Sequence, residues 1–142
     1  MTTLGDVARG DEWIVEAFGC DAGRLADRAV LASLVERMVR ELALRPIGAG
    51  QWHVFPPPGG ITGMLLLAES HLTVHTFPEH RSLCLNLFCC TPRAAWPFAE
   101  RLGERVLIRR VRGIEDSSRH WSVAILWISA IAYRVLIVNT DD

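Results

Sequence analysis

Residues 71–90 read HLTVHTFPEHRSLCLNLFCC, and apolar and polar side chains alternate along both halves of this stretch. A period of two residues is typical of a β-strand that is buried on one face. In the second half, one face carries the leucines Leu83, Leu85 and Leu87. The opposite face is mixed and carries Cys84, Asn86, Phe88 and Cys90. We therefore expect two strands, of which the second packs its leucine face on a helix, and the mixed face of that strand is where chemistry would lie.

The clearest helix signal lies upstream, where apolar residues recur from Leu31 to Leu42 at spacings of three and four. This period predicts a helix over residues 26–43, which Pro46 ends. Three further strands are predicted, at 12–18 (EWIVEAF), 50–55 (GQWHVF) and 61–70 (ITGMLLLAES). Because the last of these is a continuous apolar run, we expect burial on both of its faces.

A second helix is expected from near Trp96, with Pro97 in its first turn, to about Gly103, and a strand over 105–111 follows it. The element order is then strand, helix, several strands, helix and strand. This order favours an α+β fold over a βαβ winding: a two-layer α/β sandwich, antiparallel sheet with helices on one face. Such a sandwich leaves one sheet face uncovered, which predicts a partner subunit against that face.

The C-terminal part, residues 115–142, is an atypical hydrophobic tail. Residues 121–138 (WSVAILWISAIAYRVLIV) are almost all apolar and about as long as a short membrane helix. Tyr133 and Arg134 lie inside this run, and its many β-branched residues also fit two short strands. Packing on the sheet, contact with a partner or a membrane, and a disordered extension all stay open.

The composition is that of one globular domain, with 142 residues of which half are hydrophobic and 22% charged. A formal net charge of -1 argues against nucleic acid as the main partner. The N-terminus, MTTLGDVARGDEW, lacks the basic and apolar regions of a signal peptide, so we expect a cytoplasmic protein with reduced thiols. The cysteines form no C-x-x-C pair, which argues against a zinc finger or a disulfide framework: Cys20, Cys84, Cys89 and Cys90.

Residues 69–80, ESHLTVHTFPEH, concentrate a serine, histidines and carboxylates. Each residue alone has an ordinary structural explanation, such as a turn cap or a hydrogen-bonded core histidine. A metal site could be assembled from His71, His75, His80 and Cys84, but this spacing matches no standard site, so we predict no metal. A serine hydrolase would need G-x-S-x-G, and AESHL lacks both glycines.

Four segments together resemble the prokaryotic-type S-adenosylmethionine decarboxylases: GCD at 19–21, GITG at 60–63, LAESHLTVHTFPEH at 67–80 and LNLFCC at 85–90. The resemblance runs from about Glu12 to Arg112. Its specific part is ESHLTVHTFPE, because this string is long and ungapped.

The resemblance implies a self-processing, pyruvoyl-dependent decarboxylase whose family domain covers residues 1–114. The proenzyme would be cut between Glu69 and Ser70 into a β chain, 1–69, and an α chain, 70–142. Ser70 would become an N-terminal pyruvoyl group that forms a Schiff base with S-adenosylmethionine. The product would be decarboxylated S-adenosylmethionine, the aminopropyl donor of spermidine biosynthesis, and the enzyme a homodimer of αβ units.

The resemblance also assigns roles to single residues. His75 matches the base that removes the α-proton during processing, and Thr62 matches a hydroxyl, commonly serine, that assists it. Cys90 matches the proton donor of the decarboxylation. Next to it, Cys89 replaces the usual threonine and Thr91 the usual glycine, so the geometry around this acid departs from the family pattern.

For substrate binding, the resemblance points to Phe55, Phe77 and Glu79. Aromatic rings suit the adenine and the sulfonium cation, and a carboxylate suits the cation or the ribose. Asn86 stands where aspartate is usual, so one negative charge is lost. Two alternatives therefore stay open: a pyruvoyl-dependent ornithine or arginine decarboxylase, and a catalytically silent dimeric binding homologue.

Overall fold

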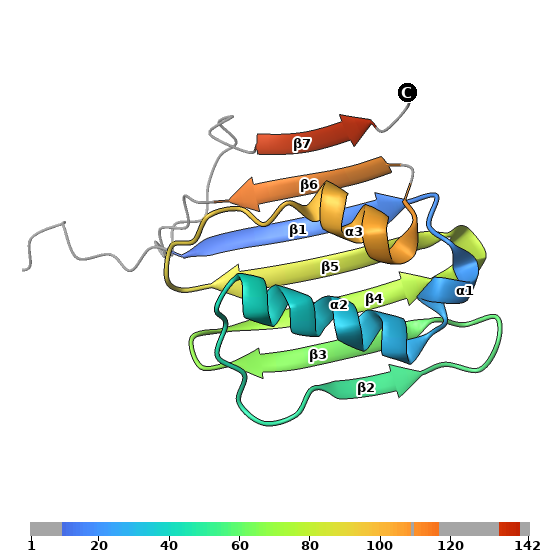
Figure 1. Cartoon of the computed structure of the whole chain (residues 1–142), viewed down its shortest axis with the longest axis horizontal. Helices are drawn as coiled ribbons and strands as arrows, with labels where there is room; N and C mark the ends of the chain where they lie inside the picture. The colour runs from blue at the N-terminus through green and yellow to red at the C-terminus, as the bar shows by residue number, and fades with distance from the viewer. Residues whose placement is uncertain (1–9, 109, 117–133, 140–142) are drawn as a thin grey trace, which may run out of the picture.

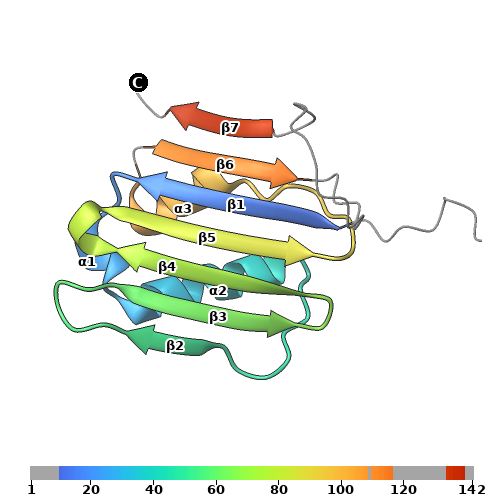
Figure 2. The same cartoon turned by 180° about the vertical axis from the view of Figure 1, so that it is seen from behind.

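The computed structural model describes residues 10–108, 110–116 and 134–139, with side chains described over the first range. Helices lie on one face of a single sheet (Figure 1), and none of the described helices lies over the other face, which is seen from behind in Figure 2. The elements are β1 (Asp11–Phe18), α1 (Ala22–Leu25), α2 (Arg28–Glu41), β2 (Gln51–Val54), β3 (Ile61–Leu67), β4 (Ser70–Phe77), η1 (Pro78–His80), β5 (Ser82–Cys89), α3 (Phe98–Val106), β6 (Arg110–Asp116) and β7 (Arg134–Asn139).

The strand order in the sheet is β2-β3-β4-β5-β1-β6-β7, and every neighbouring pair is antiparallel. This arrangement confirms the predicted α+β sandwich with helices on one face. Strand β4 lies inside the sheet, between β3 and β5. Its residues are therefore held in register from both sides, which matters below because ESHLTVHTF lies on it.

The helix predicted over 26–43 is α2, and its caps explain the shorter observed span. The Asp27 carboxylate accepts from the N–H groups of Ala29 and Val30 at 2.8 and 3.3 Å, so the helix begins after Asp27. At the other end Ala43 adopts a positive φ of 50°, which ends the helix before Pro46. The buried stripe faces the sheet, as the spacing predicts: Leu31, Leu34, Val35 and Met38.

The second helix departs from its prediction. It begins at Phe98 rather than Trp96 and continues through Gly103 to Val106, so the strand predicted over 105–111 begins later, as β6 at Arg110. The reason is that Phe98, Leu102 and Val106 form one buried stripe with a spacing of four. Glu41, near the end of α2, holds this segment in place by accepting hydrogen bonds from Trp96 Nε1 at 2.7 Å and from Arg101 Nε at 3.2 Å.

The leucine face of β5 packs under the helices, as predicted, because Leu83, Leu85 and Leu87 are at most 2% exposed. The expectation for the run ITGMLLL is wrong. Its residues alternate, and Met64 and Leu66 are 55% and 57% exposed. The helices cover only one sheet face, so these two side chains lie on the open face.

Of the tail, 115–142, the structure describes residues 115–116 at the end of β6 and Arg134–Asn139, which form β7 and pair with β6. Most of the apolar run 121–138 lies outside the described residues. Within the described part of the chain, no helix is long and apolar enough to cross a membrane. Since β6 itself runs to Asp116, the proposed domain boundary at residue 114 stays a prediction.

We predict that Thr76→Val destabilises the fold by about 2 kcal/mol. The fully buried Thr76 hydroxyl donates to the Leu25 carbonyl at 2.8 Å and accepts from the Ile61 N–H at 2.9 Å, joining α1 to the start of β3. Valine has the same shape, so the loss would come from two buried backbone groups left unpaired. Urea unfolding measures it, and Thr73→Val, on the open face of the same strand, is the matched control. An equal loss in both variants would contradict the assignment.

Candidate functional site

The hairpin that joins β3 to β4 places Glu69 and Ser70 at one end of these two strands. Leu67 pairs with Ser70, so Ala68 and Glu69 form a two-residue turn and the 69–70 peptide bond lies where β4 begins. This turn explains why the strand predicted to reach residue 70 ends at Leu67. On its other side Ser70 lies opposite Cys89, the last residue of β5.

The Glu69 residue is held by both its backbone and its side chain. The N–H of Cys90 donates to the Glu69 carbonyl oxygen at 3.2 Å. Thr91 Oγ1 donates to the Glu69 carboxylate at 3.1 Å, and the Arg45 guanidinium forms an ion pair with it. A carbonyl that accepts a hydrogen bond is polarised toward attack at its carbon. Sequence reasoning missed Arg45, because nothing in the chain connects it to Glu69, 24 residues further on.

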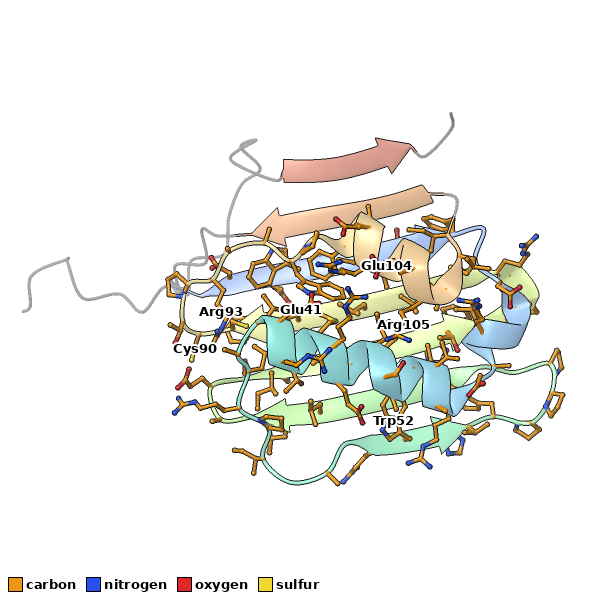
Figure 3. All side chains as sticks on the ribbon, viewed as in Figure 1. Glu41, Trp52, Cys90, Arg93, Glu104 and Arg105 are labelled. Carbon is orange, nitrogen blue, oxygen red and sulfur yellow. The ribbon has the colours of Figure 1, made fainter. Side chains whose placement is uncertain are left out.

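Two adjacent cysteines flank Ser70 in different environments. Cys89 is in the core, 2% exposed, and its thiol is hydrogen-bonded to Ser70. Burial raises the pKa of the Cys89 thiol, and this outweighs the opposite effects of Ser70 and Arg93. Cys90 is exposed, at the same end of the sheet as Arg93 (Figure 3). The family-assigned proton donor is therefore the accessible thiol of the two.

Thr62 and His75 form a second group, on β3 and β4. They are direct partners in the ladder, and Thr62 Oγ1 is hydrogen-bonded to His75 Nδ1 at 2.6 Å. The glycines of GITG are explained by close approach: a Cβ at Gly60 would overlap the Thr76 carbonyl, and one at Gly63 would lie 2.5 Å from the Trp52 ring. The two glycines thus allow the close approach that lets Thr62 hydrogen-bond to the His75 ring.

The three residues assigned to substrate binding gather around His75. Its ring centroid lies 4.4 Å from that of Phe77 and 5.9 Å from that of Phe55. These rings line an open pocket of about 400 Å³ together with Glu79 and the loop that contains Pro56 and Pro58. An aromatic pocket with one carboxylate is suited to a flat, cationic ligand.

The two groups do not meet within one chain. The first comprises Glu69, Ser70 and Cys90, and the second Thr62, His75, Phe55, Phe77 and Glu79. His75 follows Ser70 by five positions on β4, which corresponds to roughly 16 Å along a strand. Five is an odd number, so the two side chains also project to opposite sheet faces. Within one chain the predicted base therefore does not reach Ser70.

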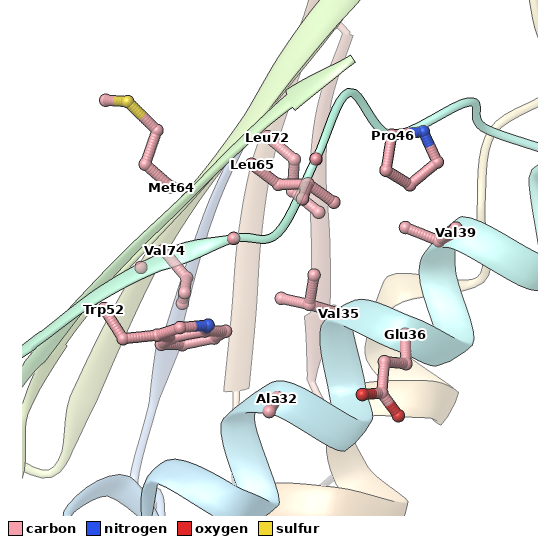
Figure 4. Close-up of a pocket in the computed structure, with 13 residues that line it drawn as sticks. Ala32, Val35, Glu36, Val39, Pro46, Trp52, Met64, Leu65, Leu72 and Val74 are labelled. Carbon is pink, nitrogen blue, oxygen red and sulfur yellow. The ribbon is translucent and has the colours of Figure 1, made fainter.

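Other parts of the described chain add little to the site. An apolar cavity of about 250 Å³ separates α2 from β2, β3 and β4, and none of the assigned residues lines it (Figure 4). Asn86 donates to the Glu12 carboxylate at 3.0 Å on the open face. Among the described residues, no group of three His, Cys, Asp or Glu side chains is placed to hold a metal ion.

Comparison with known proteins identifies the relatives of this chain. Residues 11–118 match the model of the family described as S-adenosylmethionine decarboxylase. An S-adenosylmethionine decarboxylase proenzyme of Pyrobaculum arsenaticum is 35% identical over 98 residues, which cover 66% of this chain and 78% of that protein. A protein of the same name from Clostridium tetani is 29% identical over 110 residues, covering 75% and 83%.

The fold also has a solved counterpart, the adenosylmethionine decarboxylase of Aquifex aeolicus. Its TM-score is 0.67 at 20% identity, and the match covers 86% of this chain and all of that one. At this identity the likeness establishes the fold.

We predict that Cys90 is the first thiol to be alkylated by iodoacetamide at about pH 8, because it is exposed and thiolates react. Burial raises the pKa of Cys20 to about 11 and also raises those of Cys84 and Cys89, which keeps these thiols protonated. Fragment masses measured over time identify the modified residue. Fast modification that persists in Cys90→Ser would contradict this order.

Proposed function

Because the chain belongs to the S-adenosylmethionine decarboxylase family, we propose that it is a proenzyme that cuts itself between Glu69 and Ser70 and then decarboxylates S-adenosylmethionine. The observation that carries this proposal is the hydrogen bond from the Cys90 N–H to the Glu69 carbonyl, in the peptide bond that joins Glu69 to Ser70. This contact polarises the one peptide bond that the reaction must break.

The cut requires two steps that the hairpin geometry supports. First, Ser70 Oγ adds to the carbonyl carbon of Glu69, the C–N bond breaks, and the hydroxyl proton ends on the released amine, leaving an ester. The Cys90 N–H stabilises the negative charge that develops on the Glu69 oxygen, while Arg45 and Thr91 hold the Glu69 side chain. Second, a base removes the Ser70 α-proton, and the Cβ–O bond breaks to release the Glu69 carboxylate.

Water then displaces ammonia from the new N-terminus of residues 70–142, which leaves the pyruvoyl group. This group supplies an electron-accepting carbonyl for the loss of carbon dioxide. Cys90, exposed at the hairpin, is the acid assigned to protonate the product.

The base, His75, comes from a second copy of the chain in this proposal. It lies roughly 16 Å from Ser70 in its own chain, and the open sheet face on which it lies carries the exposed apolar side chains of Ile14, Met64 and Leu66. A two-fold dimer through this face would bury them and bring the hairpin of one chain to the His75 pocket of the other. Each of the two sites would then contain residues of both chains.

Within that shared site, Phe55, Phe77 and Glu79 bind the substrate. The two rings suit stacking on adenine or contact with the sulfonium, and Glu79 supplies the negative charge for the cation. The named relatives favour S-adenosylmethionine over ornithine or arginine. The retention of Ser70, His75 and Cys90 argues against a silent binding homologue. A cytoplasmic location and a place in spermidine biosynthesis stay predictions.

We predict that the purified protein gives two masses under denaturing conditions, those of residues 1–69 and of a pyruvoyl-blocked chain 70–142. Ser70→Ala should remain one uncut chain, because the attacking hydroxyl is gone. Ser82→Ala, which alters the serine that begins the next strand, should be cut normally. A cleaved Ser70→Ala protein would refute the mechanism.

Carbon dioxide release from S-adenosylmethionine, ornithine and arginine by the cut protein then identifies the substrate. We expect release from S-adenosylmethionine. Release from either amino acid alone would replace the substrate assignment and leave the self-cleavage intact.

We further predict that Ser70→Ala and His75→Ala chains complement each other when they are co-expressed. Alone, His75→Ala should stall after ester formation, and hydroxylamine should then split it. In a mixed dimer its Ser70 would meet the intact His75 of the partner, so the His75→Ala chain should be cut. A mixed dimer, isolated through two different tags, in which this chain stays whole would contradict the shared site.

A further inference from the structure

Cys89 lies directly opposite Ser70 in the pairing of β4 with β5. Opposed residues of an antiparallel pair have Cβ atoms about 4.5–5.5 Å apart and point to the same face. Both side chains are thus on the helix side, where Cys89 is 2% exposed and hydrogen-bonded to Ser70. The neighbouring Cys90, to which the family assigns the proton transfer, is instead exposed.

The surroundings of Cys89 keep its sulfur in one place. Arg93 is hydrogen-bonded to it as well, and Arg93 is itself anchored on two sides. Its N–H donates to the Asp11 carboxylate at 2.7 Å, and its guanidinium donates to the Leu42 carbonyl at 2.5 Å. Because the guanidinium can only donate, the sulfur is the acceptor in the contact with Arg93, and the same thiol contacts the Ser70 hydroxyl.

We propose that Cys89 is a positioning residue for self-cleavage, whose thiol holds the Ser70 hydroxyl in one rotamer beside the Glu69–Ser70 peptide bond. The inference rests on the proposed function. A serine side chain has three staggered rotamers, and attack on the preceding carbonyl needs one of them. Residues 89 and 90 would thus hold both reacting groups: the Cys89 side chain fixes the hydroxyl, and the Cys90 backbone fixes the carbonyl.

The test follows cleavage with time in full-length chains made by cell-free translation, quenched in denaturant and weighed intact. Cys89→Ala and Cys89→Val should both be cut about tenfold more slowly than the wild type, because neither can hydrogen-bond to Ser70. Cys89→Ser restores a hydrogen-bonding group and should be cut within about twofold of the wild type. Cys20→Ala, which removes a fully buried thiol elsewhere, is the control and should be cut normally.

If Cys89 had only a structural role, the serine variant would be impaired at least as much as the alanine and valine variants. Serine is more polar than valine or alanine, so in a core position it should lower the thermal midpoint at least as much as they do. Slow cleavage of Cys89→Ser, equal to that of Cys89→Val, would therefore overturn the assignment, and so would normal cleavage of Cys89→Val. If Cys89→Ala does not fold, the valine and serine variants decide. A wild-type chain that is never cut would refute the proposed function itself.

Discussion

The candidate site depends on the register in which β4 is held between β3 and β5. This one ladder sets Ser70 opposite Cys89 and His75 opposite Thr62, and it ends β3 so that Glu69 forms the turn. The hydrogen bond from Cys90 to the Glu69 carbonyl continues the same pairing by one step beyond β5. A slip of one residue would send every side chain of β4 to the other face and separate both groups of the site. Because β4 is paired with a neighbour on both sides, such a slip would be costly.

The second constraint is that helices cover one sheet face only. Under the helices the sheet is apolar, and Thr76 is a buried polar exception that is hydrogen-bonded twice. The open face combines exposed apolar side chains with His75, Phe77 and the pocket at the end of β4. A face of this kind, apolar and yet carrying chemical groups, is what a shared active site between two copies of the chain would require. The proposed dimer thus follows from the same asymmetry that defines the two layers.

Much of the fold could be predicted from periodicity alone. The leucine face of β5 and the buried stripe of α2 lie where their spacing places them, because burial on one side imposes a period on the sequence. The sequence predictions failed where the same local sequence pattern fits two different structures. The apolar run of β3 looks buried on both sides, although Met64 and Leu66 lie on the open face. The segment after Gly103 is rich in β-branched and aliphatic residues, yet the stripe that includes Val106 keeps it helical.

For the candidate site, the sequence by itself determined the family and the residues of the ESH segment. These properties are local, so spacing along the chain is enough to read them. Only the tertiary structure decided that Arg45 and Thr91 hold Glu69, that Cys89 lies opposite Ser70, and that His75, the proposed base, lies toward the other end of the strand from the serine. These contacts join segments that are distant in sequence, and their distances depend on how strands pair and where each one ends.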